Sequence, residues 1–356
     1  MSGMHSMLKV VVVGPGLMGR QHIELLASTN DACLSGIVAP ASDKNMQYAE
    51  ELGVSFFSDL RACIEQVQPA GVIISSPNEF HAEQAAICVE NRIPFLLEKP
   101  LATTQDEGRE LLDIVLKAEF HGNAMVGHHR SHGAIIKKSS DLIDSGILGR
   151  LVAVQGSAQF FKPHSYFVQG PWRSKLGGGP ILLNMIHEIS NLRALLGEIE
   201  SVQVIASSDV RNTEVEDTAV INLRFESGTL GSFVLSDCTA SSKSWEMTSG
   251  ENPSYPFFPN EYCYVLAGTK GTLEIPSMVI KAYGEEKVAS WMTSFEESRA
   301  GLDRVDPLEK QIAEFVELMK GETTPTVTIQ DGYRNLAVVE AIKRAAENGS
   351  LEKVEY

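Results

Sequence analysis

The sequence Val10-Val11-Val12-Val13-Gly14-Pro15-Gly16-Leu17-Met18-Gly19 decides the fold. Four consecutive valines are typical of a parallel strand that is buried on both faces. The glycines that follow have the spacing GxGxxG, and the next residues predict a helix from about Met18 to Ser28. Backbone N–H groups and a helix start can receive a pyrophosphate at such a turn. The residues expected at the phosphates are Gly14, Gly16, Leu17, Met18 and Gly19.

Short β-branched runs and helix-like stretches alternate up to residue 127. Further strands are expected at 34–38, 54–57, 71–75, 93–97 and 124–127. Further helices are expected at 44–52, 60–67, 81–90 and 105–117, with Asp59 capping the second of these. Parallel neighbours need a crossover connection, which a helix supplies, so this alternation predicts a doubly wound parallel sheet of the Rossmann type.

The pattern changes after residue 127. Strand-like segments with turn residues between them occupy 151–160, 202–207, 217–225, 229–236, 262–267, 271–275 and 278–283. Helices are expected at 180–196 and about 330–347, and 251–260 reads as an irregular loop. Residues 128–356 therefore predict an α+β domain with a large, mostly antiparallel open sheet. Its last helix is free to pack back on the first domain, residues 1–127.

Composition excludes several classes of protein. The 356 residues contain 30 Lys and Arg against 46 Asp and Glu, a net charge of −16, which argues against nucleic acid as a partner. No apolar run reaches the roughly 18 residues of a membrane span, and the first residues lack a secretory signal, so we expect a cytoplasmic protein. The five cysteines are scattered and form no CxxC pair, which favours neither a disulfide framework nor a zinc site.

The segment after the second strand bears on the cofactor. Ala39 stands where this fold usually has an Asp or Glu that binds the ribose hydroxyls. A carboxylate there would repel a 2′-phosphate, whereas Ser42 and Lys44 would favour one. NADP(H) is therefore the favoured cofactor. NAD(H) is the alternative, in which Lys44 is a solvated residue and Asp43 takes the ribose.

Three more segments resemble landmarks of the Gfo/Idh/MocA family of oxidoreductases. They are Ser75-Ser76-Pro77-Asn78-Glu79-Phe80-His81, Glu98-Lys99-Pro100 and Gly177-Gly178-Gly179-Pro180-Ile181-Leu182-Leu183-Asn184-Met185-Ile186-His187-Glu188. With the Gly-rich turn they come in the expected order, and the resemblance covers the chain from Leu8 onward. It implies a Rossmann domain, a C-terminal α/β domain whose open sheet forms homodimers or homotetramers, and nicotinamide-dependent chemistry on a secondary hydroxyl or carbonyl.

The resemblance also implies a cofactor site along the carboxyl edge of the parallel sheet. Beyond the Gly-rich turn, the residues assigned to it are Ala39, Ser42, Lys44, Ser75, Ser76, Pro77, Asn78, His81, Glu98, Lys99, Trp172 and Arg173. The residues assigned to the substrate are His128, Arg130, Tyr166, Asn184 and His187. We expect no metal at the run from Gly127 to His132, because adjacent histidines point apart and no carboxylate completes a ligand set.

Lys99 and His187 are the candidate catalytic residues. Neighbouring positive charge would lower the pKa of the Lys99 ammonium enough for it to share a proton with the reacting oxygen. Pro100 fixes its own φ and allows a cis peptide bond before it. In the predicted helix 180–196, Asn184, His187 and Asn191 fall at i, i+3 and i+7, so they should share a polar face toward a hydroxylated substrate. Imidazole takes up a proton near neutral pH.

The chain departs from the common family pattern at two positions. Many members have an Asp four residues before this histidine and another three residues after it, whereas this chain has Leu183 and Ser190. An inositol-type triad of Asp, Lys and His is therefore not expected, but the Lys99–His187 pair is retained. The predicted function is hydride transfer between NAD(P) and a secondary alcohol or ketone of a sugar, polyol or cyclic diol. The alternatives are a ligand-sensing regulator on the same fold, which would need no proton relay, and an NAD-dependent glycosidase.

Overall fold

The computed structural model describes residues 7–284 and 287–356, which form two compact units. One unit contains the chain up to His132 together with Pro307–Leu336. The other contains Gly133–Asp306 and Ala337–Tyr356. The sequence-based division at residue 127 treats each domain as one continuous stretch, whereas the first unit also includes a segment from near the end of the chain.

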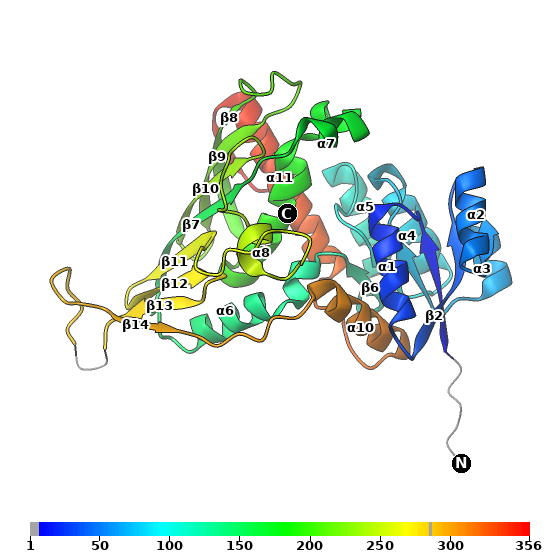
Figure 1. Ribbon diagram of the computed structural model, residues 1–356, viewed down its shortest axis with the longest axis horizontal. Helices are drawn as coiled ribbons and strands as arrows, with labels where there is room; N and C mark the ends of the chain where they lie inside the picture. The colour runs from blue at the N-terminus through cyan, green and yellow to red at the C-terminus, as the bar shows by residue number, and fades with distance from the viewer. Residues whose placement is uncertain (1–6, 285–286) are drawn as a thin grey trace, which may run out of the picture. The chain divides into compact units, whose positions relative to one another are not determined.

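The first unit is built on a six-stranded parallel sheet with the strand order β3-β2-β1-β4-β5-β6. Its strands are β1 (Leu8–Val13), β2 (Ala32–Val38), β3 (Ser55–Phe57), β4 (Gly71–Ile74), β5 (Phe95–Leu97) and β6 (Ala124–Val126). The connecting helices are α1 (Leu17–Ala27), α2 (Asp43–Glu51), α3 (Leu60–Val67), α4 (His81–Glu90) and α5 (Gln105–Lys117) (Figure 1). This is the strand order of dinucleotide-binding Rossmann domains, and it confirms the predicted fold class.

The four valines of β1 explain why the sheet is covered on both sides. Successive strand residues point to opposite faces, and all four valines are at most 2% exposed. Val11 and Val13 pack in the cluster that contains residues of α3, α4 and α5. Val10 and Val12 pack in the cluster that contains residues of α1 and of α10 (Pro307–Lys320). Burying each such side chain stabilises the unit by about 1.5–3 kcal/mol.

The second unit is built on a nine-stranded sheet with the order β14-β13-β12-β11-β7-β10-β9-β8-β15. Its strands are β7 (Leu151–Gln159), β8 (Ile199–Ser207), β9 (Thr218–Phe225), β10 (Leu230–Ser236), β11 (Tyr264–Gly268), β12 (Gly271–Ile275), β13 (Val279–Ala282), β14 (Glu296–Arg299) and β15 (Leu351–Lys353). Among the pairings described, β7 with β10 is parallel and the others are antiparallel. The predicted mostly antiparallel sheet is therefore confirmed.

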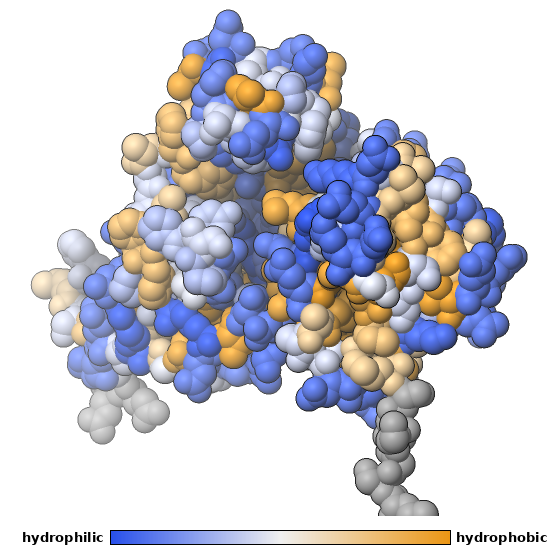
Figure 2. All heavy atoms as spheres, turned by 45° about the vertical axis from the view of Figure 1, so that its right-hand side comes forward, coloured by the Kyte–Doolittle hydropathy of each residue, from blue (hydrophilic) through white to orange (hydrophobic). Residues whose placement is uncertain are grey.

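Helices cover one face of this sheet. They are α6 (Ala134–Asp144), α8 (Ile186–Leu196) and the second half of α11 (Ile329–Asn348), whose residues share one core cluster with the strands (Figure 1). Along β9, Ile221 is fully buried and Val220 is 42% exposed, so the opposite face of the sheet is open. Tyr333, in the first half of α11, lies in a core of the first unit instead. Apolar residues reach the molecular surface among polar ones (Figure 2).

Several elements were not predicted from the sequence. They are α6, α10, β14, β15 and the short helices α7 (His164–Gln169) and α9 (Trp245–Ser249). The predicted single helix 180–196 is a π-helical turn, Ile181–Met185, followed by α8. Asp59 caps α3 as predicted, accepting a hydrogen bond from the Ala62 N–H at 2.8 Å. None of the described helices is long and apolar enough to span a bilayer.

Candidate active site

The Gly-rich turn between β1 and α1 has the geometry that a pyrophosphate requires. Gly14 has φ +81°, and a Cβ there would lie 2.6 Å from the backbone of Ser76. A Cβ at Gly19 would lie 2.2 Å from the Gly14 carbonyl oxygen, so both positions require glycine. A Cβ at Gly16 would meet nothing within 4 Å, and no side chain caps the start of α1 at Leu17. The open side and the uncapped N–H groups, which include those of Leu17 and Met18, fit the diphosphate of a dinucleotide.

The segment after β4 supports this turn. The Ser75 hydroxyl lies 3.0 Å from the Val13 carbonyl oxygen and 2.9 Å from that of Gly14, and can donate to either. The Ser76 hydroxyl donates to Gln84, and Pro77 and Asn78 follow at the start of a short 3₁₀ helix. The predicted cofactor residues Ser75 and Ser76 thus hold backbone and side-chain atoms of their own unit.

His81 links the segments that follow β4 and β5. Its Nδ1 lies 2.8 Å from the Pro100 carbonyl oxygen, and its Nε2 lies 2.9 Å from that of Ser76. Burial lowers the pKa of His81, so the neutral ring donates one of these two hydrogen bonds. His81 was predicted to bind the cofactor, but both of its ring nitrogens face backbone carbonyls.

Lys99 follows β5 and is held by the residue before it. The buried Glu98 carboxylate accepts a hydrogen bond from His22 Nε2 at 2.8 Å through Oε1, and from the Lys99 N–H at 3.3 Å through Oε2. The Lys99–Pro100 peptide bond is cis, the form that the sequence allowed. Glu98 was predicted to contact the cofactor, but both oxygens of its carboxylate are engaged within the unit and fix the backbone of Lys99.

The charged groups around Lys99 and its burial shift its pKa. Burial lowers the pKa of the Lys99 ammonium, Glu98 opposes this, and the Arg130 guanidinium lowers it further. Burial alone would raise the pKa of the Glu98 carboxyl, but the hydrogen bond from His22 and the nearby positive charges hold it below its ordinary value. Burial and Arg130 lower the pKa of His129 to about 3. A neutral imidazole, a carboxylate and a lysine of lowered pKa therefore adjoin one another.

The predicted substrate residues His128 and Arg130 follow β6, the neighbour of β5. Both are buried, and the Asn335 amide donates to His128 Nε2 at 3.1 Å. His132 Nδ1 lies 3.1 Å from Glu314 on α10, which ties this segment to the helix. Because β5 and β6 are parallel neighbours, these residues lie at the same carboxyl edge as Lys99. In residues 7–284 and 287–356, no group of three His, Cys, Asp or Glu side chains could hold a metal ion.

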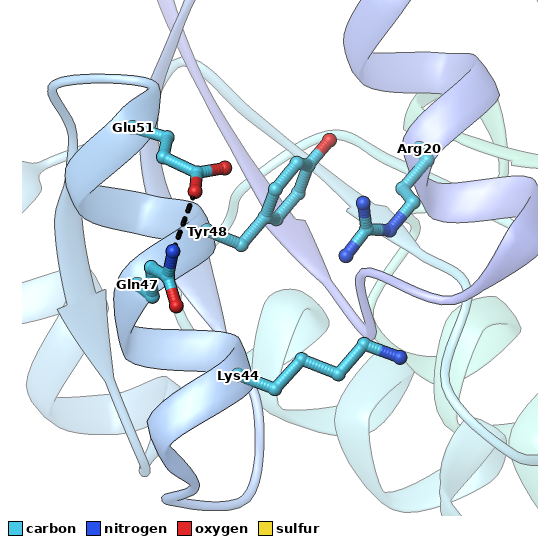
Figure 3. A pocket seen from close by; sticks show the side chains of 5 residues that line it. All are labelled: Arg20, Lys44, Gln47, Tyr48 and Glu51. Atoms are coloured by element: carbon cyan, nitrogen blue, oxygen red, sulfur yellow. Dashed lines mark hydrogen bonds between the residues drawn. The ribbon is translucent and has the colours of Figure 1, made fainter.

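The segment after β2 leads into α2, which lines a cavity together with α1. Ala39 is buried, and Ser42 caps α2 by accepting a hydrogen bond from the Asn45 N–H at 3.2 Å. Lys44 lines a cavity of about 330 Å³ (Figure 3). The other lining residues are Arg20, Gln47, Tyr48 and Glu51. Among the residues that the structure describes, no carboxylate pairs with Lys44 or with Arg20.

His187 lies in the first turn of α8, directly after the π-helical turn that carries Asn184. Lys162 Nζ donates to Asn184 Oδ1 at 2.7 Å. Asn191 is 0% exposed and donates to the Tyr264 hydroxyl at 3.1 Å, and that hydroxyl donates to Glu188. The prediction that Asn191 shares a substrate-facing side with Asn184 and His187 is therefore wrong, because Asn191 is fully buried and its amide nitrogen is bonded to a core tyrosine.

Lys162 belongs to a group of internally paired charges in the second unit. The Asp237 carboxylate lies 2.6 Å from Arg211 Nε and 3.7 Å from Lys162 Nζ. Burial is the main cause that lowers the pKa of Lys162 to about 8, although Asp237 opposes it. The Tyr166 ring lies 5.0 Å from Lys162 Nζ. The second unit therefore holds a lysine whose side chain is only 13% exposed and whose charge is balanced by residues of the same unit.

Three residues predicted for the cofactor and the substrate come together around α7. The Arg173 guanidinium lies 4.0 Å from the centre of the Tyr166 ring and 5.7 Å from that of Trp172. Arg173 also donates to the Tyr166 carbonyl oxygen at 2.6 Å, and Trp172 is 51% exposed. Arg173 and Tyr166 thus brace each other.

Sequence reasoning missed several residues that build these sites. They are His22, which holds Glu98; Arg20, which lines the cavity beside Lys44; Arg211 and Asp237, which surround Lys162; and Glu216, which accepts a hydrogen bond from the Ile181 N–H at 2.7 Å. Most of these partners are far apart along the chain, as are His22 and Glu98, so no local motif signals them.

Comparison with known proteins agrees with this geometry. Residues 8–128 match the model of an oxidoreductase family's NAD-binding Rossmann fold, and residues 140–355 match that of its C-terminal alpha/beta domain. The chain belongs to the Gfo/Idh/MocA oxidoreductase family. It is an oxidoreductase whose N-terminal part is an NAD-binding Rossmann domain, as the motifs predicted.

Relatives in this family differ in their substrates. The 1,5-anhydro-D-fructose reductase of Ensifer adhaerens is 25% identical over 353 residues, 97% of this chain and 98% of that protein. The myo-inositol 2-dehydrogenase of Thermotoga maritima is 26% identical over 232 residues, 63% and 67% of the two chains. The WlbA dehydrogenase from Bordetella pertussis, solved with NADH and UDP-GlcNAcA, has the same fold, with a TM-score of 0.77 and 22% identity over 99% of this chain and 100% of that one.

Proposed function

We propose that the protein is an NADP(H)-preferring dehydrogenase or reductase that interconverts a secondary hydroxyl and a carbonyl on a sugar, polyol or cyclic diol. The proposal rests mainly on Lys99, which lies at the carboxyl edge of an NAD-binding sheet. Its pKa is lowered, and its backbone N–H is held by the Glu98 carboxylate. When bound, the nicotinamide supplies the hydride acceptor or donor. The protein supplies orientation and proton transfer.

Lys99 is the proposed acid and base at the reacting oxygen. As an ammonium it donates a proton to a carbonyl that is being reduced, and as an amine it accepts one from a hydroxyl that is being oxidised. A lowered pKa makes both forms accessible closer to neutral pH. His187 is the proposed second proton carrier, and Asn184 and Tyr166 are proposed contacts to substrate hydroxyls. The assignments of Asn184 and Tyr166 rest on the contacts of each residue within its own unit, and that of His187 rests on its position in the first turn of α8.

The preference for NADP(H) rests on the segment after β2. Ala39 leaves no carboxylate at the position where one would bind ribose hydroxyls and repel a 2′-phosphate. Lys44, in the first turn of α2, has no ion-pair partner among the described residues and lines an open cavity. A basic residue there favours a phosphate.

The substrate class is supported by the relatives' names. The full-length relative is named for a reductase of an anhydro sugar, and the next for an inositol dehydrogenase. Both substrates are neutral and polyhydroxylated.

We also propose that copies of the chain join through the open face of the nine-stranded sheet, where Ile205 is 76% and Leu230 is 49% exposed.

The test is a substrate panel assayed with all four nicotinamide cofactors. Sugars, anhydro sugars, inositols and cyclic diols are supplied with the oxidised cofactors and the matching ketones with the reduced ones, and nicotinamide absorbance is followed. Lys99→Met should lower kcat by about 10²- to 10⁴-fold, the usual contribution of a general acid or base. Lys117→Met, at an exposed lysine of α5, is the matched control and should leave kcat unchanged.

Two results would overturn the proposal. A Lys99→Met enzyme with unchanged kcat would remove Lys99 from the chemistry. A protein that binds cofactor but turns over none with any member of the panel would instead support the regulator, or the glycosidase if it cleaves glycosides without net turnover of nicotinamide.

A further inference from the structure

The cavity between α1 and α2 contains two basic side chains that the residues around it do not neutralise. Arg20 reaches it from α1, and Lys44 and Tyr48 reach it from α2 (Figure 3). The one carboxylate in its lining, Glu51, accepts a hydrogen bond from Gln47 Nε2 at 2.9 Å. Two cations therefore stand against one carboxylate that already has a partner.

Arg20 is held in a defined position. Its Nε donates to the Pro15 carbonyl oxygen at 3.2 Å, within the Gly-rich turn. Its guanidinium carbon lies 3.7 Å from the centre of the Tyr48 ring, so the planar group stacks on that face. No described residue accepts a hydrogen bond from its two terminal Nη groups. A planar fork fixed at Nε and on one face, with both Nη groups open, matches the way that arginine binds phosphate.

The position of the cavity indicates which phosphate of a dinucleotide these two side chains would bind. Pro15 belongs to the turn that fits the diphosphate, and Lys44 lies in the first turn of the helix after β2, where a Rossmann sheet binds the adenosine ribose. A phosphate on the 2′-hydroxyl of that ribose would come between the two segments.

We propose that Arg20, stacked on Tyr48, forms with Lys44 a binding site for the 2′-phosphate of NADP(H), so that a residue of α1 determines cofactor specificity. The inference rests on the proposed function and deepens it. Ala39 and Lys44 belong to the segment after β2. Arg20, to which this inference assigns the distinction between NADP(H) and NAD(H), lies outside that segment.

The test uses two nucleotide fragments that differ in this phosphate, 2′,5′-ADP and 5′-AMP, titrated calorimetrically into the full-length protein. The wild type should bind 2′,5′-ADP more tightly than 5′-AMP. Arg20→Gln should weaken 2′,5′-ADP by about 10- to 100-fold, as expected for the loss of hydrogen bonds between charged groups. It should change 5′-AMP by less than about twofold. Tyr48→Leu keeps both cations and should weaken 2′,5′-ADP by about two- to fivefold, the scale of an exposed cation–π contact.

Arg61→Gln is the matched control. Arg61 is an exposed arginine of α3 that pairs with Glu90 at 2.7 Å, so its loss should leave both fragments unchanged. Arg20→Lys keeps the charge without the planar fork and should recover part of the lost affinity. A thermal melt of each variant verifies that it is folded.

The outcomes separate this inference from the proposed function. If the wild type prefers 2′,5′-ADP and Arg20→Gln keeps that preference, the role of Arg20 is wrong while the NADP(H)-dependent enzyme stands. If Arg20→Gln weakens both fragments equally, Arg20 supports the Gly-rich turn through Pro15 and does not read the 2′-phosphate. If the wild type does not distinguish the fragments, the 2′-phosphate site and the NADP(H) preference both fall, and the oxidoreductase assignment remains.

Discussion

Two groups of basic side chains in this protein are built in opposite ways. In the first unit, Arg20 and Lys44 line an open cavity and no carboxylate pairs with either among the described residues. In the second unit, Lys162 and Arg211 surround the buried carboxylate of Asp237. The cations of the first group have no paired carboxylate in the part of the chain that the structure describes and are available to an anionic ligand. The cations of the second group are paired with a carboxylate of the protein itself.

This difference indicates that the first group binds a ligand, whereas the second group positions other residues of the protein. A cationic side chain that is held in place and open to solvent gains its counter-charge from a bound ligand. Buried cations must have a partner in the protein, because an unpaired buried charge is strongly destabilising. Lys162 in turn donates to Asn184, so the buried group holds a predicted substrate residue in place. The account therefore expects substitutions in the second group to affect stability and those in the first to affect ligand binding.

The largest expected effect is that of Asp237→Asn. This change leaves Lys162 and Arg211 without their shared carboxylate, and breaking a buried ion pair from one side costs about 3–5 kcal/mol. Urea unfolding followed by intrinsic fluorescence measures the loss. A loss below about 1 kcal/mol would show that Asp237 does not form a stabilising ion pair with Lys162 and Arg211.

Lys162→Met should reveal the same group through its pH dependence. The pKa of Lys162 is about 8 in the folded protein against 10.5 in the unfolded chain. Between these values the unfolded chain binds more protons, so this lysine makes the free energy of unfolding rise with pH. At neutral pH the wild type therefore bears a penalty that Lys162→Met lacks, up to about 3 kcal/mol at 1.36 kcal/mol per pKa unit.

The measurement is the difference in unfolding free energy between wild type and Lys162→Met from neutral pH to about pH 10.5. The advantage of the variant should shrink across this window. A difference that is constant with pH would mean that Lys162 titrates normally in the folded protein.

A smaller effect is expected for Glu98→Gln, which extends the comparison to a buried carboxylate beside Lys99. The pKa of Glu98 lies below the 4.5 of the unfolded chain, despite burial, because His22 and nearby cations stabilise its charge. Its stabilising contribution is therefore complete above about pH 4.5 and is lost as the pH falls through the folded-state pKa. Acid unfolding of wild type and variant should converge at low pH, and parallel curves would contradict the shift.

The smallest expected effects on stability are those of Arg20→Gln and Lys44→Gln. Neither removes the partner of a buried charge. Lys44→Gln should change the free energy of unfolding by less than about 0.5 kcal/mol. Arg20→Gln also loses the hydrogen bond to Pro15 and the stack on Tyr48, so it should cost about 1 kcal/mol. Urea unfolding without nucleotide measures this. A loss comparable to that of Asp237→Asn would show that the open group also stabilises the fold, and the comparison between the two groups would fail.

The parts of the fold that the sequence predicted have strong local signals. The four valines, the glycine spacing and the alternation of strands with helices predicted every strand of the first sheet. The missed helix α10 has Ile312, Phe315 and Val316 at helical spacing, a signal that was present. Its place beside β1 depends on contacts between distant segments, which spacing does not encode. Strand β14 has four exposed residues and therefore no hydrophobic alternation to detect.

The sequence motifs indicated candidate site residues, but they did not indicate the distant residues that hold these candidates in place. Lys99 was identified from Glu98-Lys99-Pro100, but the hydrogen bond between His22 and Glu98 joins residues 76 positions apart. The face assigned to Asn184, His187 and Asn191 assumed regular helical spacing, and the π-helical turn at Ile181–Met185 interrupts it. The bond from Asn191 to Tyr264 is likewise visible only in the folded chain.

Cofactor binding by the purified wild-type protein tests the central claim most directly. Equal concentrations of NADP⁺, NADPH, NAD⁺ and NADH are compared by thermal shift, because a ligand that binds the native state raises its stability by mass action. The account predicts larger shifts with NADP⁺ and NADPH than with NAD⁺ and NADH. Equal or larger shifts with NAD⁺ and NADH would contradict the open cationic site, and a protein free of bound nucleotide that responds to none of the four would contradict the proposed function itself.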